Sequence, residues 1–169
     1  EETSLFDPAY QVKLLSERED NLMMSLARRL RQARDLSVEE AAKVVDQAQD
    51  HLLAVAEAHV DRIVFEAILD GESHLRTKQG AKVFEQIRDV YFLSTLLDNA
   101  SWYLEQNMLT GTRTKAARAA LNDLVDSLGP WSQTLVDAFG VPSLMRDTML
   151  LEDYDEMVPL CERRPAGSA

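Results

Sequence analysis

The sequence predicts an all-α protein: an up-and-down bundle of four long helices followed by short C-terminal helices. Only 6 Gly and 5 Pro occur among 169 residues, so residues that break helices are far apart. The segments between them are rich in Ala, Leu, Glu, Asp, Arg and Gln, a composition that favours helix. Apolar residues recur in these segments at steps of three and four, the period of an amphipathic helix. We expect a single domain over residues 1–169, with a frayed tail over about 163–169.

The first helix is predicted to begin at Asp7-Pro8 and to end near Arg34. Asp is a favoured N-cap, and Pro is favoured at the first helical position because its fixed φ suits a helix and no N–H is lost there. Leucines at helical spacing mark the side predicted to face the core: Leu15, Leu22, Leu26 and Leu30.

The second helix is predicted to begin at the capping box Ser37-Val38-Glu39-Glu40 and to run to Asp70, where Gly71 would end it. A helix of about 33 residues spans roughly 50 Å, a length typical of bundles. Its predicted core-facing residues are Ala41, Val45, Ala48, Leu52, Val55, His59 and Ile63.

The third and fourth long helices are predicted near Lys78 to Asn107 and near Arg113 to Leu128, joined by the turn Thr110-Gly111-Thr112. The predicted core-facing residues of the third are Val83, Ile87, Val90, Ser94, Leu97, Ser101 and Leu104, with Phe84, Tyr91 and Trp102 beside them. Those of the fourth are Ala117, Ala120, Leu121, Leu124 and Leu128.

Gly129-Pro130 should interrupt the fourth helix, because Pro removes a backbone donor and clashes with the preceding turn. A short helix is then expected up to Phe139, ended by Gly140. Beyond Pro142, Ser143 is placed to cap one more short helix.

Composition limits the partners and the setting of the chain. Lys and Arg number 18 against 29 Asp and Glu, a net charge of -11, so we expect no nucleic-acid partner. The sequence lacks an apolar run of about 18 residues, so no membrane span is expected. The single Cys161 favours a reduced, intracellular setting. The start, Glu1-Glu2-Thr3-Ser4, does not resemble a signal peptide, and we expect a processed or excised chain.

The sequence predicts no metal site and no catalytic residue. A carboxylate-bridged site in a helical bundle needs Glu-x-x-His pairs, and no Glu here has His three residues on. His51 and His59 lie roughly 12 Å apart by helical rise, too far to share a metal. Cys161 has no evident base, and there is no glycine-rich phosphate loop or GxSxG elbow.

Two features leave alternatives open. His59 is either a core histidine bonded to a backbone carbonyl or a carboxylate, or an interface histidine that contacts a partner domain; His51 and His74 are expected to be exposed. A basic run of Arg28, Arg29, Arg31 and Arg34, with Arg18 further back, is either a solvated face near a helix C-terminus or a docking patch for an acidic surface or a nucleotide phosphate.

The chain resembles the C-terminal α-helical domain of flavin-dependent acyl-CoA oxidases, which belong to the acyl-CoA dehydrogenase superfamily. The resemblance rests on the order and spacing of several blocks. These blocks are Asp7-Pro8-Ala9-Tyr10-Gln11, Arg18-Glu19, Leu26-Ala27-Arg28-Arg29-Leu30, Ala56-Glu57-Ala58-His59-Val60, Val64-Phe65, Val90-Tyr91-Phe92-Leu93-Ser94 and Leu135-Val136-Asp137-Ala138-Phe139-Gly140-Val141-Pro142.

The resemblance implies a larger parent enzyme that binds FAD and desaturates fatty acyl-CoA at the α,β position in fatty acid β-oxidation. The family's catalytic Glu lies upstream, so no catalytic residue is carried over and the cofactor-binding residues are unknown. The implied role of this domain is to pack on the upstream flavin-binding and helical domains, support a homodimer and cover part of the substrate or FAD cleft. The implied acceptor is oxygen in the oxidases and an electron-transfer protein in the dehydrogenases.

The chain ends in Gly167-Ser168-Ala169, which is not a peroxisomal tripeptide, so a cytoplasmic, bacterial-type member is expected. The alternative function is a self-contained helical interaction or adaptor module, without enzymatic activity, that docks through its second and third helices.

Overall fold

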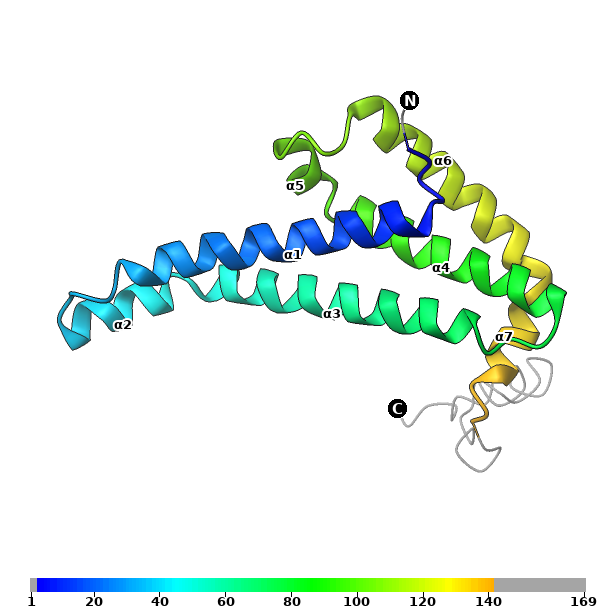
Figure 1. The fold of residues 1–169 in the computed structure, drawn as a ribbon, viewed down its shortest axis with the longest axis horizontal. Coiled ribbons are helices and arrows are strands. Elements are labelled where there is room, and N and C mark those ends of the chain that lie inside the picture. Colours follow the sequence, from blue (N-terminus) through cyan, green and yellow to red (C-terminus); the bar gives the residue numbers. More distant parts are fainter. Residues whose placement is uncertain (1–2, 142–169) are drawn as a thin grey trace, which may run out of the picture. The chain divides into compact units, whose positions relative to one another are not determined.

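The computed structural model describes residues 3–141, and every regular element in that range is helical. The elements in chain order are α1 (Pro8–Arg31), α2 (Val38–Asp46), α3 (Gln49–Glu72), α4 (Lys78–Asp98), α5 (Ala100–Glu105), α6 (Gly111–Leu128), the 3-10 turn η1 (Gly129–Trp131) and α7 (Ser132–Ala138) (Figure 1). The predicted all-α bundle is confirmed. The chain forms two compact units, one up to Leu128 and one from Gly129 onward.

The capping signals at the helix starts are confirmed. The Asp7 carboxylate accepts a hydrogen bond of 3.0 Å from the Ala9 amide, and Pro8 is the first helical residue. Ser37 and Glu40 form a reciprocal capping box: the Ser37 hydroxyl accepts from the Glu40 amide and the Glu40 carboxylate accepts from the Ser37 amide. These bonds satisfy amides that a helix start leaves without partners.

The prediction of one continuous second helix was wrong, because residues 47–48 divide it into α2 and α3. Ala48 leaves helical geometry with φ -96° and ψ 0°, and it is buried. The Gln47 carbonyl, released from the helix, accepts a 2.6 Å hydrogen bond from the Arg29 guanidinium of α1. Tertiary contacts of this kind are not visible in the local sequence.

Gly71 does not end this helix, since α3 continues to Glu72. A Cβ atom at Gly71 would lie 3.2 Å from the Phe84 ring. The glycine therefore allows the Phe84 ring on α4 to approach the α3 backbone closely, and the prediction that it terminates the helix was wrong.

The predicted third helix is also interrupted, at Asn99, between α4 and α5. Asn99 has φ -107° and ψ 19°; its side-chain amide donates to the Thr95 carbonyl, and its side-chain oxygen accepts from Arg18 of α1. The fourth helix begins at Gly111 rather than Arg113, and the Thr110 hydroxyl accepts from the Arg113 amide.

In the unit up to Leu128, α1 and α3 lie side by side and run in opposite directions, and α4 packs on both α3 and α6 (Figure 1). The core lies where the first half of α1, the second half of α3 and helices α4 to α6 meet. Its buried members are Leu14, Leu15, Phe65, Phe92, Leu93, Leu96, Tyr103, Leu109 and Ala117. Phe65 and Phe92 meet edge to face with ring centroids 6.0 Å apart.

The predicted core-facing residues are confirmed for the first and fourth helices, where Leu15, Leu26 and Ala117 are buried. For the second helix four of the seven are wrong, although Ala48 is buried as predicted. Val45, Leu52, His59 and Ile63 are exposed, whereas Ala58 and Phe65 are buried. The third helix buries Phe92, Leu93 and Leu96, which were not predicted. Of the predicted residues, Tyr91, Leu97 and Trp102 are partly buried and pack against this core. Apolar residues surround much of α3, so periodicity alone does not identify the side that packs on α1.

The second unit is described up to Val141 and contains η1 and α7. The predicted interruption at Gly129-Pro130 is confirmed, and Gly140 follows the short helix with a positive φ of 60°. The helix predicted after Ser143 and the predicted frayed tail over about 163–169 lie outside the described residues. No helix within residues 3–141 is both long and apolar enough to cross a membrane.

Candidate functional site

Arg18 is the centre of a buried polar contact between helices. Its side chain reaches from α1 to Asp61 on α3 and to Asn99 at the α4–α5 junction, with N···O distances of 3.1 and 2.6 Å. Arg18 is only 3% exposed, so its grouping with the basic run of α1 was wrong. The residue joins three helices instead of forming a charged surface.

Asp61, the acid of this contact, is partly buried. Burial raises the pKa of the Asp61 carboxyl, while the charge of Arg18 acts in the opposite direction. The Tyr91 hydroxyl donates to the Asp61 backbone carbonyl at 3.3 Å. The carboxylate is thus held by a fixed cation, and the neighbouring backbone is bonded to α4.

Glu19, the next residue on α1, is buried, and its carboxylate accepts hydrogen bonds from two side chains of α3. Arg62 donates to one carboxylate oxygen, and His59 Nδ1 donates to the other at 2.8 Å. The hydrogen bond from Arg62 is the main reason that the pKa of Glu19 is lowered, and burial opposes it. Arg62 also pairs with Glu66 at 2.7 Å.

His59 is therefore bonded to a carboxylate, as one of the two hypotheses expected. It is not a core residue, however, because its side chain is 48% exposed. Its second proposed role, contact with a partner domain, stays a prediction. His51, expected to be exposed, is half-buried and bonded to the Leu22 carbonyl at 3.1 Å, whereas His74 is exposed as predicted.

A third polar cluster joins the start of α1 to α3 and α4. Arg88 pairs with Glu72 at 2.7 Å and with Asp89 at 3.0 Å. Asp89 also accepts from the buried Gln11 amide at 2.9 Å, and Gln11 donates to the Leu5 carbonyl. Each of the three clusters contains at least one ion pair between two helices, so the clusters can fix the alignment of the helices.

The clusters differ in how they treat their carboxylates, and the described residues show no metal site. Arg62 stabilises the ionised form of Glu19, which makes this carboxylate a poor proton acceptor near neutral pH. Among residues 3–141, no group of three or more His, Cys, Asp and Glu side chains is arranged to hold a metal ion. The prediction of no catalytic residue is not tested by this arrangement and stays a prediction.

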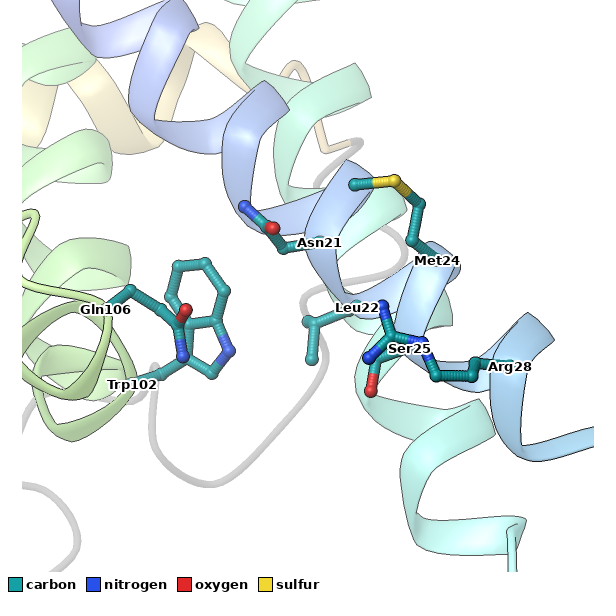
Figure 2. Close-up of a pocket in the computed structure, with 7 residues that line it drawn as sticks. All are labelled: Asn21, Leu22, Met24, Ser25, Arg28, Trp102 and Gln106. Carbon is teal, nitrogen blue, oxygen red and sulfur yellow. The ribbon is translucent and has the colours of Figure 1, made fainter.

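An open groove of about 240 Å³ lies between α1 and the α5 region (Figure 2). Figure 2 shows Trp102 and Gln106 on one side, with Leu22, Ser25 and Arg28 of α1 facing them. Within the described part of the chain, Arg28 makes no hydrogen bond or ion pair. The groove offers one guanidinium, an indole face and neutral polar groups.

The basic run of α1 is divided by the structure. Arg28 lines the groove, and Arg29 bonds the Gln47 carbonyl at the α2–α3 junction. Arg31 and Arg34 are exposed at the end of α1, where cations are favourable near the helix C-terminus. A docking role for the whole run stays a prediction.

The free energy of unfolding should depend on pH in acid through the contacts of Glu19. Because the folded pKa of Glu19 lies below its reference of 4.5, its ionised form contributes stability above that value, and this contribution is lost as pH falls through the folded pKa. Asp61 acts in the opposite sense, since its folded pKa is raised. When the pH is lowered from about 5 to about 3, the free energy of unfolding should fall less for Glu19→Gln than for the wild type.

Urea unfolding at several pH values measures this slope. The matched variant Asp61→Asn should show a steeper loss than the wild type over the same range, because it removes the opposing contribution. Parallel pH profiles for Glu19→Gln and the wild type would show that Glu19 is not ion-paired in solution.

The chain matches the acyl-CoA oxidase family over residues 7–149, a range that includes every helix from α1 to α7. The chain belongs to the acyl-CoA oxidase family. A comparison with curated proteins found no match. The side chains of all three polar clusters and of the groove of this acyl-CoA oxidase domain lie within the matched residues. The family expected from the sequence blocks is confirmed.

Proposed function

We propose that this chain is the C-terminal helical domain of an FAD-dependent acyl-CoA oxidase or dehydrogenase that desaturates fatty acyl-CoA at the α,β position in fatty acid β-oxidation. The observation that carries the proposal is the family match over residues 7–149. Within that range, the buried charged side chains are paired between helices. This supports a scaffolding role.

The flavin of the proposed enzyme would take up the β-hydrogen of the acyl chain as hydride. The groove between α1 and the α5 region does not itself fit this cofactor. The groove of about 240 Å³ is small beside the roughly 300–1,000 Å³ of pockets that enclose drug-sized ligands, and FAD is larger than such ligands. We therefore assign the flavin site and the catalytic carboxylate to other parts of the enzyme and derive no chemical step here.

Homodimer formation and cytoplasmic location belong to the same proposal. The family resemblance supports the first, and the presence of a single cysteine, Cys161, which favours a reduced intracellular setting, supports the second. In this proposal the domain packs on the upstream flavin-binding and helical domains and covers part of their cleft.

The complete product of the gene that encodes this chain provides the test. We expect it to carry FAD, seen as flavin absorbance, and to convert fatty acyl-CoA to the enoyl product, with hydrogen peroxide released if oxygen is the acceptor. The 169-residue chain alone should be colourless and inactive. A yellow preparation of this chain alone that turns over acyl-CoA would refute the division of roles.

A second candidate function is a helical interaction module without enzymatic activity. The observation in its favour is the set of large apolar side chains exposed on α3, among them Leu53 and Val60. The same experiment separates the two candidates, because a complete gene product without flavin or activity on acyl-CoA supports the interaction module.

A further inference from the structure

Helix α3 is apolar on the side that faces away from its packing partners. Ala58 and Phe65 are buried where α3 packs on α1 and α4. On the opposite side the large side chains are exposed; Leu53, for example, is 64% exposed. We call this side the outer strip of α3, and its members are Leu52, Leu53, Ala56, Val60, Ile63, Val64 and Ala67. A helix that is apolar around most of its circumference is usually covered on both sides.

The spacing within the outer strip indicates what covers it. Five of its members follow one another at steps of three, four, three and four: Leu53, Ala56, Val60, Ile63 and Ala67. This is the seven-residue repeat by which two helices pack side by side with knobs in holes. Ala56 and Ala67 are small enough for a partner helix to approach closely. A second helix, crossing at about 20°, is the shape that fits such a seam.

The edges of the strip carry negative charge. Asp50 and Glu57 lie exposed along one edge, and Glu66 and Asp70 along the other. The one cation of α3 is Arg62, which is engaged by Glu19 and Glu66. Charges beside an apolar seam select the partner, because like charges across an interface are repelled.

We propose that the outer strip of α3 docks an amphipathic helix of another protein segment, with an apolar seam flanked by Lys and Arg. The charges argue against a second copy of α3 as the occupant. Both edges are acidic, so a parallel or an antiparallel pairing of two copies would bring acidic edges together. The inference deepens the packing role proposed above and rests on that role alone. Its test uses neither flavin nor acyl-CoA, so its failure is distinguishable from failure of the enzymatic proposal.

Two synthetic helical peptides of about four heptads test the inference. Both carry Leu and Ala at the seam positions; one has Lys at all flanking positions and its twin has Glu. Fluorescence anisotropy of the labelled peptides with the full 169-residue chain measures binding. We expect the Lys peptide to bind and its Glu twin to bind at least about tenfold more weakly, with the difference reduced by salt.

Three variants locate the contact. Val60→Glu combined with Ile63→Glu should abolish binding of the Lys peptide without unfolding the chain, because both side chains are exposed. Val125→Glu, at an exposed valine of α6, is the matched control and should bind as the wild type does. Reversing the edges with Asp50→Lys, Glu57→Lys and Asp70→Lys should shift the preference to the Glu peptide.

Several outcomes would overturn the inference. These are no binding of the Lys peptide, equal binding of both peptides, or binding that survives the Val60 and Ile63 changes. Sedimentation of the chain as a dimer that those changes dissociate would assign the strip to a second copy instead.

Discussion

Replacement of Arg18 by methionine is expected to lower the free energy of unfolding by about 3 kcal/mol. Arg18 is buried and bonded to both Asp61 and Asn99. The variant leaves the Asp61 carboxylate without its cation and the Asn99 oxygen without its donor, and an uncompensated buried charge is costly. Urea unfolding followed by circular dichroism measures the change.

A matched control is available on the same helix. Lys13→Met removes a solvent-exposed pair with Glu17, whose atoms lie 3.7 Å apart, and should cost at most about 0.5 kcal/mol. Combining Arg18→Met with Asp61→Asn should recover part of the loss, because the unpaired charge is then absent. Equal effects of Arg18→Met and Lys13→Met would contradict the buried contact.

Truncation of Phe92 to alanine is expected to cost about 3–5 kcal/mol of unfolding free energy. The Phe92 ring is fully buried at the centre of the core and packs edge to face against Phe65. Its removal leaves a cavity that the surrounding helices cannot fill completely, so both transfer energy and packing are lost. Chemical denaturation again provides the measurement.

Phe139→Ala is the control for this change, since Phe139 is 81% exposed and its loss should stay within about 0.5 kcal/mol. A cost below about 1 kcal/mol for Phe92→Ala would show that the core is not packed as described. The two variants make the same chemical change at a buried and at an exposed site. The difference between their losses of unfolding free energy therefore measures the effect of burial.

The sequence predicted what depends on local contacts. Asp7, Pro8 and the Ser37–Glu40 box begin helices where expected, because a cap is made by residues within one turn. Gly129-Pro130 likewise interrupts α6 as expected. The family also followed from the sequence, since the order of several blocks along the chain is a property of the sequence.

The polar clusters were harder to predict because their partners are far apart in sequence. Arg18 and Asn99 are 81 residues apart. A signal existed nonetheless: Arg18 and Glu19 occupy a position of α1 between Leu15 and Leu22, where an apolar residue would continue the core-facing side. A charged residue at such a position indicates a buried partner, although it does not identify the partner.

The sequence by itself determined the helical class, the starts of α1 and α2 and the family, because each depends on neighbouring residues or on their order. Only the tertiary structure decided which side of α3 is buried, where the long helices are interrupted and which acids meet which cations. Those features depend on contacts between helices: Arg18 holds Asn99 at the α4–α5 junction, and Arg29 holds the Gln47 carbonyl between α2 and α3. Apolar residues recur at the same steps of three and four on both sides of α3. Packing against other helices, and not this spacing, therefore distinguishes the buried side from the outer strip.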